Sequence, residues 1–215
     1  PILSRKAFFN HKRILQGEWK GFDSTANLGI ELNNKTLGIY GLGRIGFELA
    51  RKAKAAYNMD IIYYNRSRNK DAEQILGAQY VNFDELLTRS DVISVHAALT
   101  PETKNRFDKN SFTRMKNTAI LVNTARGGLV NESDLTEALQ TGQLWGAGLD
   151  VTDPEPMDPK NPLLAMENVC VLPHIGSATV ETRDNMALMA ANNILAAIKG
   201  EKMPQIINNE VYSRS

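Results

Sequence analysis

The fold is decided by Thr36-Leu-Gly-Ile-Tyr-Gly-Leu-Gly-Arg-Ile-Gly46, an apolar run followed directly by the spacing G-x-G-x-x-G. Gly41 permits a tight turn, Gly43 lets backbone amides approach a pyrophosphate, and Gly46 lets the next helix pack closely on the strand. The positive end of that helix then favours phosphate. The spacing alone is weak, but a strand before it and a helical pattern after it indicate a dinucleotide site.

Short apolar runs alternate with helical patterns from Thr36 onward. The expected strands are 36–40, 60–64, 92–96, 119–123, 146–149 and 169–172. The expected helices between them are 45–56, 71–76, 84–89 and 133–140. Apolar strands separated by helices favour a parallel sheet covered on both faces. Right-handed crossovers would wind it into a doubly wound Rossmann α/β fold.

The segments on either side of this alternation are expected to lie outside the Rossmann unit. We predict that residues 1–34 are an interdomain helix and linker, that 35–178 are the dinucleotide-binding domain, and that 179–215 are a C-terminal helix and tail. The last helical pattern, 179–199, ends before Gly200, and no strand follows it. It is therefore expected to return to a second domain.

Composition and charge exclude several classes of protein. The formal net charge is +1, so no overall field favours nucleic acid or an anionic membrane as a partner. No secretory signal or long apolar span is evident, and the single cysteine, Cys170, cannot form an internal disulfide. It lies in an apolar run and is expected to be buried. We expect a reducing compartment, the cytoplasm.

The second expected strand ends at Asn65, followed by Arg66, Ser67 and Arg68. NAD-binding domains of this kind usually carry an acidic residue there for the ribose hydroxyls, and an acid would repel a 2′-phosphate. Two guanidinium groups and a hydroxyl suit an additional phosphate instead. The segment favours NADP(H) over NAD(H), with NAD(H) use still possible, although a solvated basic loop remains the alternative reading.

Four further segments occur in one order and carry a resemblance. They are Thr100-Pro-Glu-Thr103, Asn123-Thr-Ala-Arg-Gly-Gly-Leu-Val-Asn-Glu132, Gly148-Leu-Asp-Val-Thr-Asp-Pro-Glu-Pro156 and Leu172-Pro-His-Ile-Gly-Ser-Ala-Thr179. Together they resemble the D-isomer-specific 2-hydroxyacid dehydrogenases, and most of all the glyoxylate/hydroxypyruvate reductase branch. The similarity runs from about residue 16 to residue 204.

The resemblance implies an oxidoreductase that reduces a small 2-keto acid to a 2-hydroxy acid. His174 would donate the proton, for which imidazole is suited near neutral pH. Glu155 would pair with the other ring nitrogen and orient the ring. Arg126, just after a strand end, would bind the substrate carboxylate and polarise the carbonyl.

The same resemblance completes the expected cofactor contacts and assigns no metal. Asp150 would hold the nicotinamide carboxamide. The remaining contacts would be Arg44, Ile45, Thr124 and Ser177, with His96 peripheral or near the cofactor ribose.

The family builds a flavodoxin-like substrate domain largely from its N-terminal part, and only helical remnants of it are expected in this sequence. We therefore expect a fragment with little or no turnover alone, from a protein that forms a homodimer. Two alternatives remain. One is another dehydrogenase of the family, such as a phosphoglycerate dehydrogenase-like protein. The other is a nucleotide-sensing corepressor that acts as a binding scaffold, which would bind partner peptides and turn over feebly.

Overall fold

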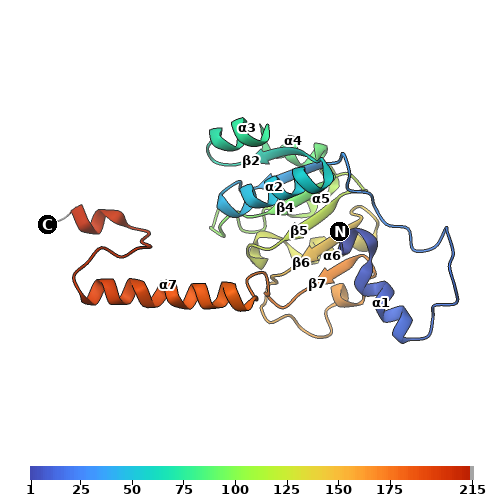
Figure 1. The fold of residues 1–215 in the computed structure, drawn as a ribbon. Helices are drawn as coiled ribbons and strands as arrows, with labels where there is room; N and C mark the ends of the chain where they lie inside the picture. The colour runs from blue at the N-terminus through green and yellow to red at the C-terminus, as the bar shows by residue number, and fades with distance from the viewer. Residues whose placement is uncertain (214–215) are drawn as a thin grey trace. The chain divides into compact units, whose positions relative to one another are not determined.

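A computed structural model describes residues 1–213, so the last two residues of the expected tail lie outside the described part. The chain divides into a first unit, Pro1–His174, and a second that begins at Ile175 (Figure 1). Across residues 1–213, no helix is both long enough and apolar enough to cross a membrane.

The first unit is built on one seven-stranded sheet in which every pairing is parallel. The strand order is β3-β2-β1-β4-β5-β6-β7. The strands are β1 (Thr36–Tyr40), β2 (Asp60–Tyr64), β3 (Gln79–Tyr80), β4 (Val92–Val95), β5 (Ile120–Asn123), β6 (Gly146–Leu149) and β7 (Val169–Val171). This order confirms the doubly wound parallel fold expected from the sequence.

α-Helices connect successive strands from β1 to β6, and a 3-10 turn lies between β6 and β7 (Figure 1). The helices of the first unit are α1 (Ala7–Leu15), α2 (Arg44–Tyr57), α3 (Lys70–Leu76), α4 (Phe83–Arg89), α5 (Lys109–Arg114) and α6 (Glu132–Gln140), with 3-10 turns η1 (Leu3–Arg5), η2 (Gly127–Leu129) and η3 (Pro162–Ala165). The second unit holds α7 (Val180–Ile198) and the 3-10 turn η4 (Asn209–Ser213).

Two apolar clusters make up the core and pack on opposite faces of the central strands. Alternate side chains of β1 enter different clusters, with Leu37 and Ile39 in one and Tyr40 in the other. This alternation follows from the two-residue repeat of a strand whose two faces are both covered. Each fully buried aliphatic or aromatic side chain contributes roughly 1.5–3 kcal/mol of transfer free energy.

The chain reverses its winding direction at β1, which pairs with β2 on one side and β4 on the other. Tyr40 stands opposite Tyr64 and Val95 in the two registers. The residues that follow, Gly41, Asn65 and His96, therefore emerge together at the carboxyl edge of the sheet. In open α/β sheets this edge, at the switch point, is where ligands bind.

The structure differs from the sequence-based expectations in several local features. The expected N-terminal helix is interrupted at Lys6, whose backbone is left-handed (φ 50°). Strand β3 and helix α5 were not predicted, because the two exposed residues of β3 make no apolar run and α5 is only six residues long. Cys170 is half-buried rather than buried, and partial burial raises the pKa of its thiol.

Candidate active site

The glycine turn between β1 and α2 leaves open space at only one of its three glycines. Gly41 has φ 98°, and a Cβ there would lie 2.6 Å from the backbone nitrogen of Ala97. A Cβ on Gly46 would lie 3.0 Å from the carbonyl oxygen of Gly41. No atom lies within 4 Å of the position that a Cβ on Gly43 would take. The turn is thus closely packed at Gly41 and Gly46 and open at Gly43, at the N-terminus of α2, where a phosphate group can approach.

Two asparagines hold the backbone of this turn in place. The side-chain oxygen of Asn65 accepts a hydrogen bond from the Leu42 amide at 2.6 Å. The side-chain amide of Asn69 donates to the Leu42 carbonyl at 3.0 Å. Asn65 was predicted to be a cofactor contact in the position of the usual acid. In the structure its amide shapes the glycine turn, a role that the spacing of the motif does not reveal.

The three residues after Asn65 are exposed, and the two arginines among them have different surroundings. Arg68 forms a two-pronged ion pair with Glu73, with nitrogen–oxygen distances of 2.9 and 2.7 Å. The Thr100 hydroxyl lowers the pKa of Glu102 by hydrogen bonding, and the charge of Arg66 lowers it further. Arg66 therefore lies near the loop after β4.

Ile45, His96, Thr124 and Arg126 line one cleft at the carboxyl edge, with a volume of about 600 Å³. His96 reaches it from the end of β4, and its Nε2 lies 2.8 Å from the Ser94 hydroxyl. Burial lowers the pKa of His96, which favours the neutral ring. The cleft thus brings together predicted cofactor contacts from α2 and from the β5 end.

His174 and Glu155 form a direct pair on the neighbouring part of this edge. The Nδ1 atom of His174 lies 2.7 Å from Oε1 of Glu155, and the two side chains are 48% and 44% exposed. The hydrogen bond from His174 lowers the pKa of Glu155, and the Thr152 backbone and the charge of Arg126 lower it further. The carboxylate is therefore kept ionised beside an imidazole.

Arg126 is positioned through its backbone and through one side-chain bond, from its Nη1 to the Ala125 carbonyl at 2.5 Å. The buried Asn123, at the end of β5, donates from its side-chain amide to the Arg126 carbonyl at 2.8 Å and accepts from the Ala125 amide at 3.0 Å. The next residue, Gly127, packs so closely on the Thr152 backbone that a Cβ would lie 2.0 Å from the Thr152 carbonyl oxygen. This contact sets the loop of Arg126 against the loop of Glu155. Neither Asn123 nor Gly127 was among the site residues predicted from the sequence.

A second hollow of about 670 Å³ adjoins the histidine pair. Its wall is largely apolar and includes Asp150, Glu155, Met157, Leu172 and His174. Asp150 follows β6 and is 7% exposed. Ser177, also predicted to contact the cofactor, is in the second unit.

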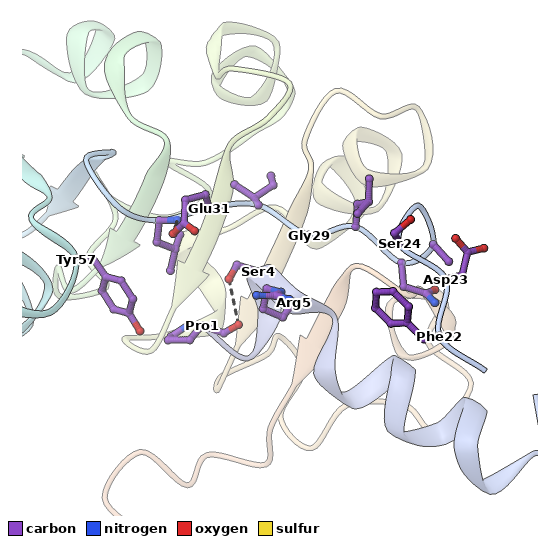
Figure 2. A pocket seen from close by; sticks show the side chains of 14 residues that line it. Pro1, Ser4, Arg5, Phe22, Asp23, Ser24, Gly29, Glu31 and Tyr57 are labelled. Atoms are coloured by element: carbon purple, nitrogen blue, oxygen red, sulfur yellow. Dashed lines mark hydrogen bonds between the residues drawn. The ribbon is translucent and has the colours of Figure 1, made fainter. Parts of the chain in front are cut away.

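A separate hollow of about 530 Å³ lies within the N-terminal segment of the first unit (Figure 2). It is lined by residues of 1–5 and 22–32 together with Tyr57, and the Ser4 hydroxyl donates to the Pro1 carbonyl at 3.0 Å. None of the predicted site residues lines it, so it is no part of the candidate active site.

Comparison with protein families finds one matching model over residues 2–176, described as the NAD binding domain of D-isomer specific 2-hydroxyacid dehydrogenases. The curated relatives include a glyoxylate reductase of Aeropyrum pernix, 46% identical over 91% of this chain and 59% of the relative. A glyoxylate/hydroxypyruvate reductase B of Cronobacter sakazakii is 42% identical over 95% of this chain and 63% of the relative. The chain thus spans about three fifths of the length of these relatives.

Among solved structures, the TT0316 protein of Thermus thermophilus superposes with a TM-score of 0.89 at 41% identity. The match covers 95% of this chain and 63% of that one.

Proposed function

Because this chain belongs to the D-isomer-specific 2-hydroxyacid dehydrogenase family, we propose that its protein reduces a small 2-keto acid, glyoxylate or hydroxypyruvate, to the D-2-hydroxy acid. The observation that carries the proposal is the 2.7 Å contact between His174 and Glu155. Arg126 is close enough for its charge to lower the pKa of that carboxylate. Three groups suited to keto-acid chemistry therefore gather at the ligand-binding edge of the sheet.

His174 is the proposed proton donor. Its Nδ1–H donates to Glu155, which holds the ring and leaves Nε2 for the substrate. As the keto carbon is reduced, Nε2–H protonates the developing alkoxide, so the C=O bond becomes C–OH and the imidazole is left neutral.

Arg126 is the proposed binding group for the substrate carboxylate. Its planar guanidinium presents paired donors that match a carboxylate, and its charge polarises the adjacent carbonyl. The bonds from Asn123 to Ala125 and Arg126 fix the backbone from which it extends. The keto acid would then lie between Arg126 and His174.

The residues at the switch point fit a nicotinamide dinucleotide. The open space at Gly43, at the start of α2, accepts a pyrophosphate, while Ile45 and Thr124 line the adjoining cleft. Such a cofactor supplies the hydride when bound. Asp150 is the proposed partner of its carboxamide. Exposed Arg66 and Ser67 support a preference for NADP(H), since both can donate to a 2′-phosphate.

The test is NADPH oxidation with glyoxylate and hydroxypyruvate, with NADH in parallel, measured on this chain and on the full natural polypeptide. We expect turnover in the latter, faster with NADPH. His174→Gln should lower kcat by roughly 10²- to 10⁴-fold. His11→Gln, in the peripheral helix α1, is the matched control and should change nothing. Turnover of H174Q at the wild-type rate would rule out the proposed proton donor, and no turnover with either keto acid would rule out the substrate class.

A further inference from the structure

Arg68 is one of two arginines in the segment proposed to receive the 2′-phosphate, yet a carboxylate already holds its guanidinium. Nε and Nη2 of Arg68 donate to the two oxygens of Glu73 at 2.9 and 2.7 Å. This two-pronged geometry is the strongest form of arginine–carboxylate contact. The side chain of Arg68 is 63% exposed, whereas that of Glu73 is only 21% exposed.

Glu73 is held in place by Tyr63, a residue of the sheet. The hydroxyl of Tyr63, a fully buried residue of β2, donates to Oε1 of Glu73 at 2.7 Å. The same hydroxyl accepts from the Asn69 amide at 2.7 Å, and the Asn69 side chain caps α3. The hydrogen bonds from Arg68 and Tyr63 both lower the pKa of Glu73. Glu73 is thus an ionised, anchored group that cannot easily swing away from Arg68.

Arg66 lacks such a partner. Among residues 1–213, none of the ion pairs involves the guanidinium of Arg66. Its charge acts at longer range on Glu102, whose pKa it lowers. Two arginines two residues apart are therefore unequal: the charge of one is neutralised within the chain, and the charge of the other is available.

We propose that Glu73 determines the cofactor specificity of this protein by neutralising Arg68 and so limiting the affinity for a 2′-phosphate. The inference rests on the proposed nicotinamide cofactor. A 2′-phosphate placed at this loop would meet the full charge of Arg66, but it would compete with Glu73 for Arg68 and be repelled by the carboxylate. Removing the charge of Glu73 would release Arg68 and favour NADP(H) over NAD(H).

The test measures binding by calorimetry on this chain, with adenosine 2′,5′-bisphosphate and AMP as probes that differ only in the 2′-phosphate. Glu73→Gln keeps the length of the side chain and an oxygen for Tyr63. We expect it to tighten bisphosphate binding about fivefold, the size of one exposed charge pair, and to leave AMP binding unchanged. If E73Q does not fold, Glu73→Ala provides the same loss of charge with a good helix former.

Two further variants test whether the release of Arg68 causes the tighter binding of the bisphosphate. Glu137→Gln removes the same charge from an exposed pair with Lys109 and should leave both affinities unchanged. The double variant Arg68→Met with E73Q should lose the gain. The inference is overturned if E73Q leaves the ratio of the bisphosphate and AMP affinities unchanged. It is also overturned if E137Q tightens bisphosphate binding equally, or if the double variant without Arg68 keeps the tighter binding. A wild-type chain that binds both probes equally contradicts the proposed NADP(H) preference instead, because the inference concerns only the change from wild type to E73Q.

Discussion

Gly127→Ala should separate the two loops that carry the proposed catalytic groups. A Cβ on Gly127 would lie 2.0 Å from the Thr152 carbonyl oxygen, whereas ordinary contacts begin at 3.4 Å, so one backbone must move by about 1.4 Å, the difference between these distances. That movement changes the position of Arg126 relative to Glu155. A misplacement of about 1 Å typically costs about 10² in rate, or about 2.7 kcal/mol in the activation barrier.

The assay is kcat/KM for glyoxylate with NADPH in the full natural polypeptide, together with the thermal unfolding and NADPH affinity of this chain. We expect kcat/KM to fall about 100-fold, stability to fall by about 1–3 kcal/mol through overpacking, and NADPH affinity to stay within about threefold, roughly 0.6 kcal/mol. Gly148→Ala is the matched control, since a Cβ there meets Leu3 and Val122 at 3.5 and 3.9 Å. A folded G127A protein with wild-type kcat/KM would refute the reasoning.

Three other predictions concern the glycine turn and the histidine pair. Gly41→Ala should lower both the unfolding temperature and NADPH affinity, because it adds about 1–2 kcal/mol of left-handed strain and places a Cβ only 2.6 Å from the backbone nitrogen of Ala97. Gly43→Ala should mainly weaken NADPH binding, so equal unfolding temperatures of the two variants would contradict this. Asn65→Ala should weaken NADH and NADPH binding alike, about tenfold, because Asn65 bonds to Leu42; a loss confined to NADPH in titrations would show direct phosphate contact. His174→Gln should raise the pKa of Glu155 toward its ordinary 4.5 in a carboxyl NMR titration. The pKa of Glu155 is depressed in the folded state, so its ionised carboxylate stabilises the fold above pH 4.5 and loses this contribution as the pH falls through the depressed pKa. The excess of the wild-type free energy of unfolding over that of H174Q should therefore shrink below pH 4.5. An excess that stays constant with pH would contradict this prediction.

Much of the fold could be predicted because its strands are buried on both faces. The sequences of such strands are uninterrupted apolar runs, which are easy to recognise. The bounds of β1, β2 and β6 match the predicted ones. The motif around Gly41 marks the switch point because a strand precedes it and a helix follows. Strand β3 carries no such signal: its two residues are exposed and extend the sheet by backbone bonds alone.

The candidate site was predictable where a motif specifies the residue type, as for the pairing of His174 with Glu155. The role of a residue was not predictable where its side chain binds the backbone or another side chain of the same protein. Asn65 stands where an acid is usual, yet its amide is occupied by Leu42. The sequence indicates a phosphate ligand at Arg68, but it does not show that the first turn of α3 places Glu73 against the guanidinium. Such contacts depend on the path of the chain between the residues, which local patterns do not encode.

The all-parallel sheet also has a consequence for how the chain reaches its native state. No two of its strands can join through a tight hairpin, so every pairing must first close a long loop. The pairing of β1 with β4 joins Leu37 to Val92. Folding dominated by such non-local contacts is slow, in the range of milliseconds to seconds. During synthesis the strands around the glycine turn can assemble first, whereas β7 and His174 are among the last parts of the first unit to emerge. We therefore expect a nucleotide-binding half to form before β7, with the proposed proton donor His174 just after it, has joined the sheet.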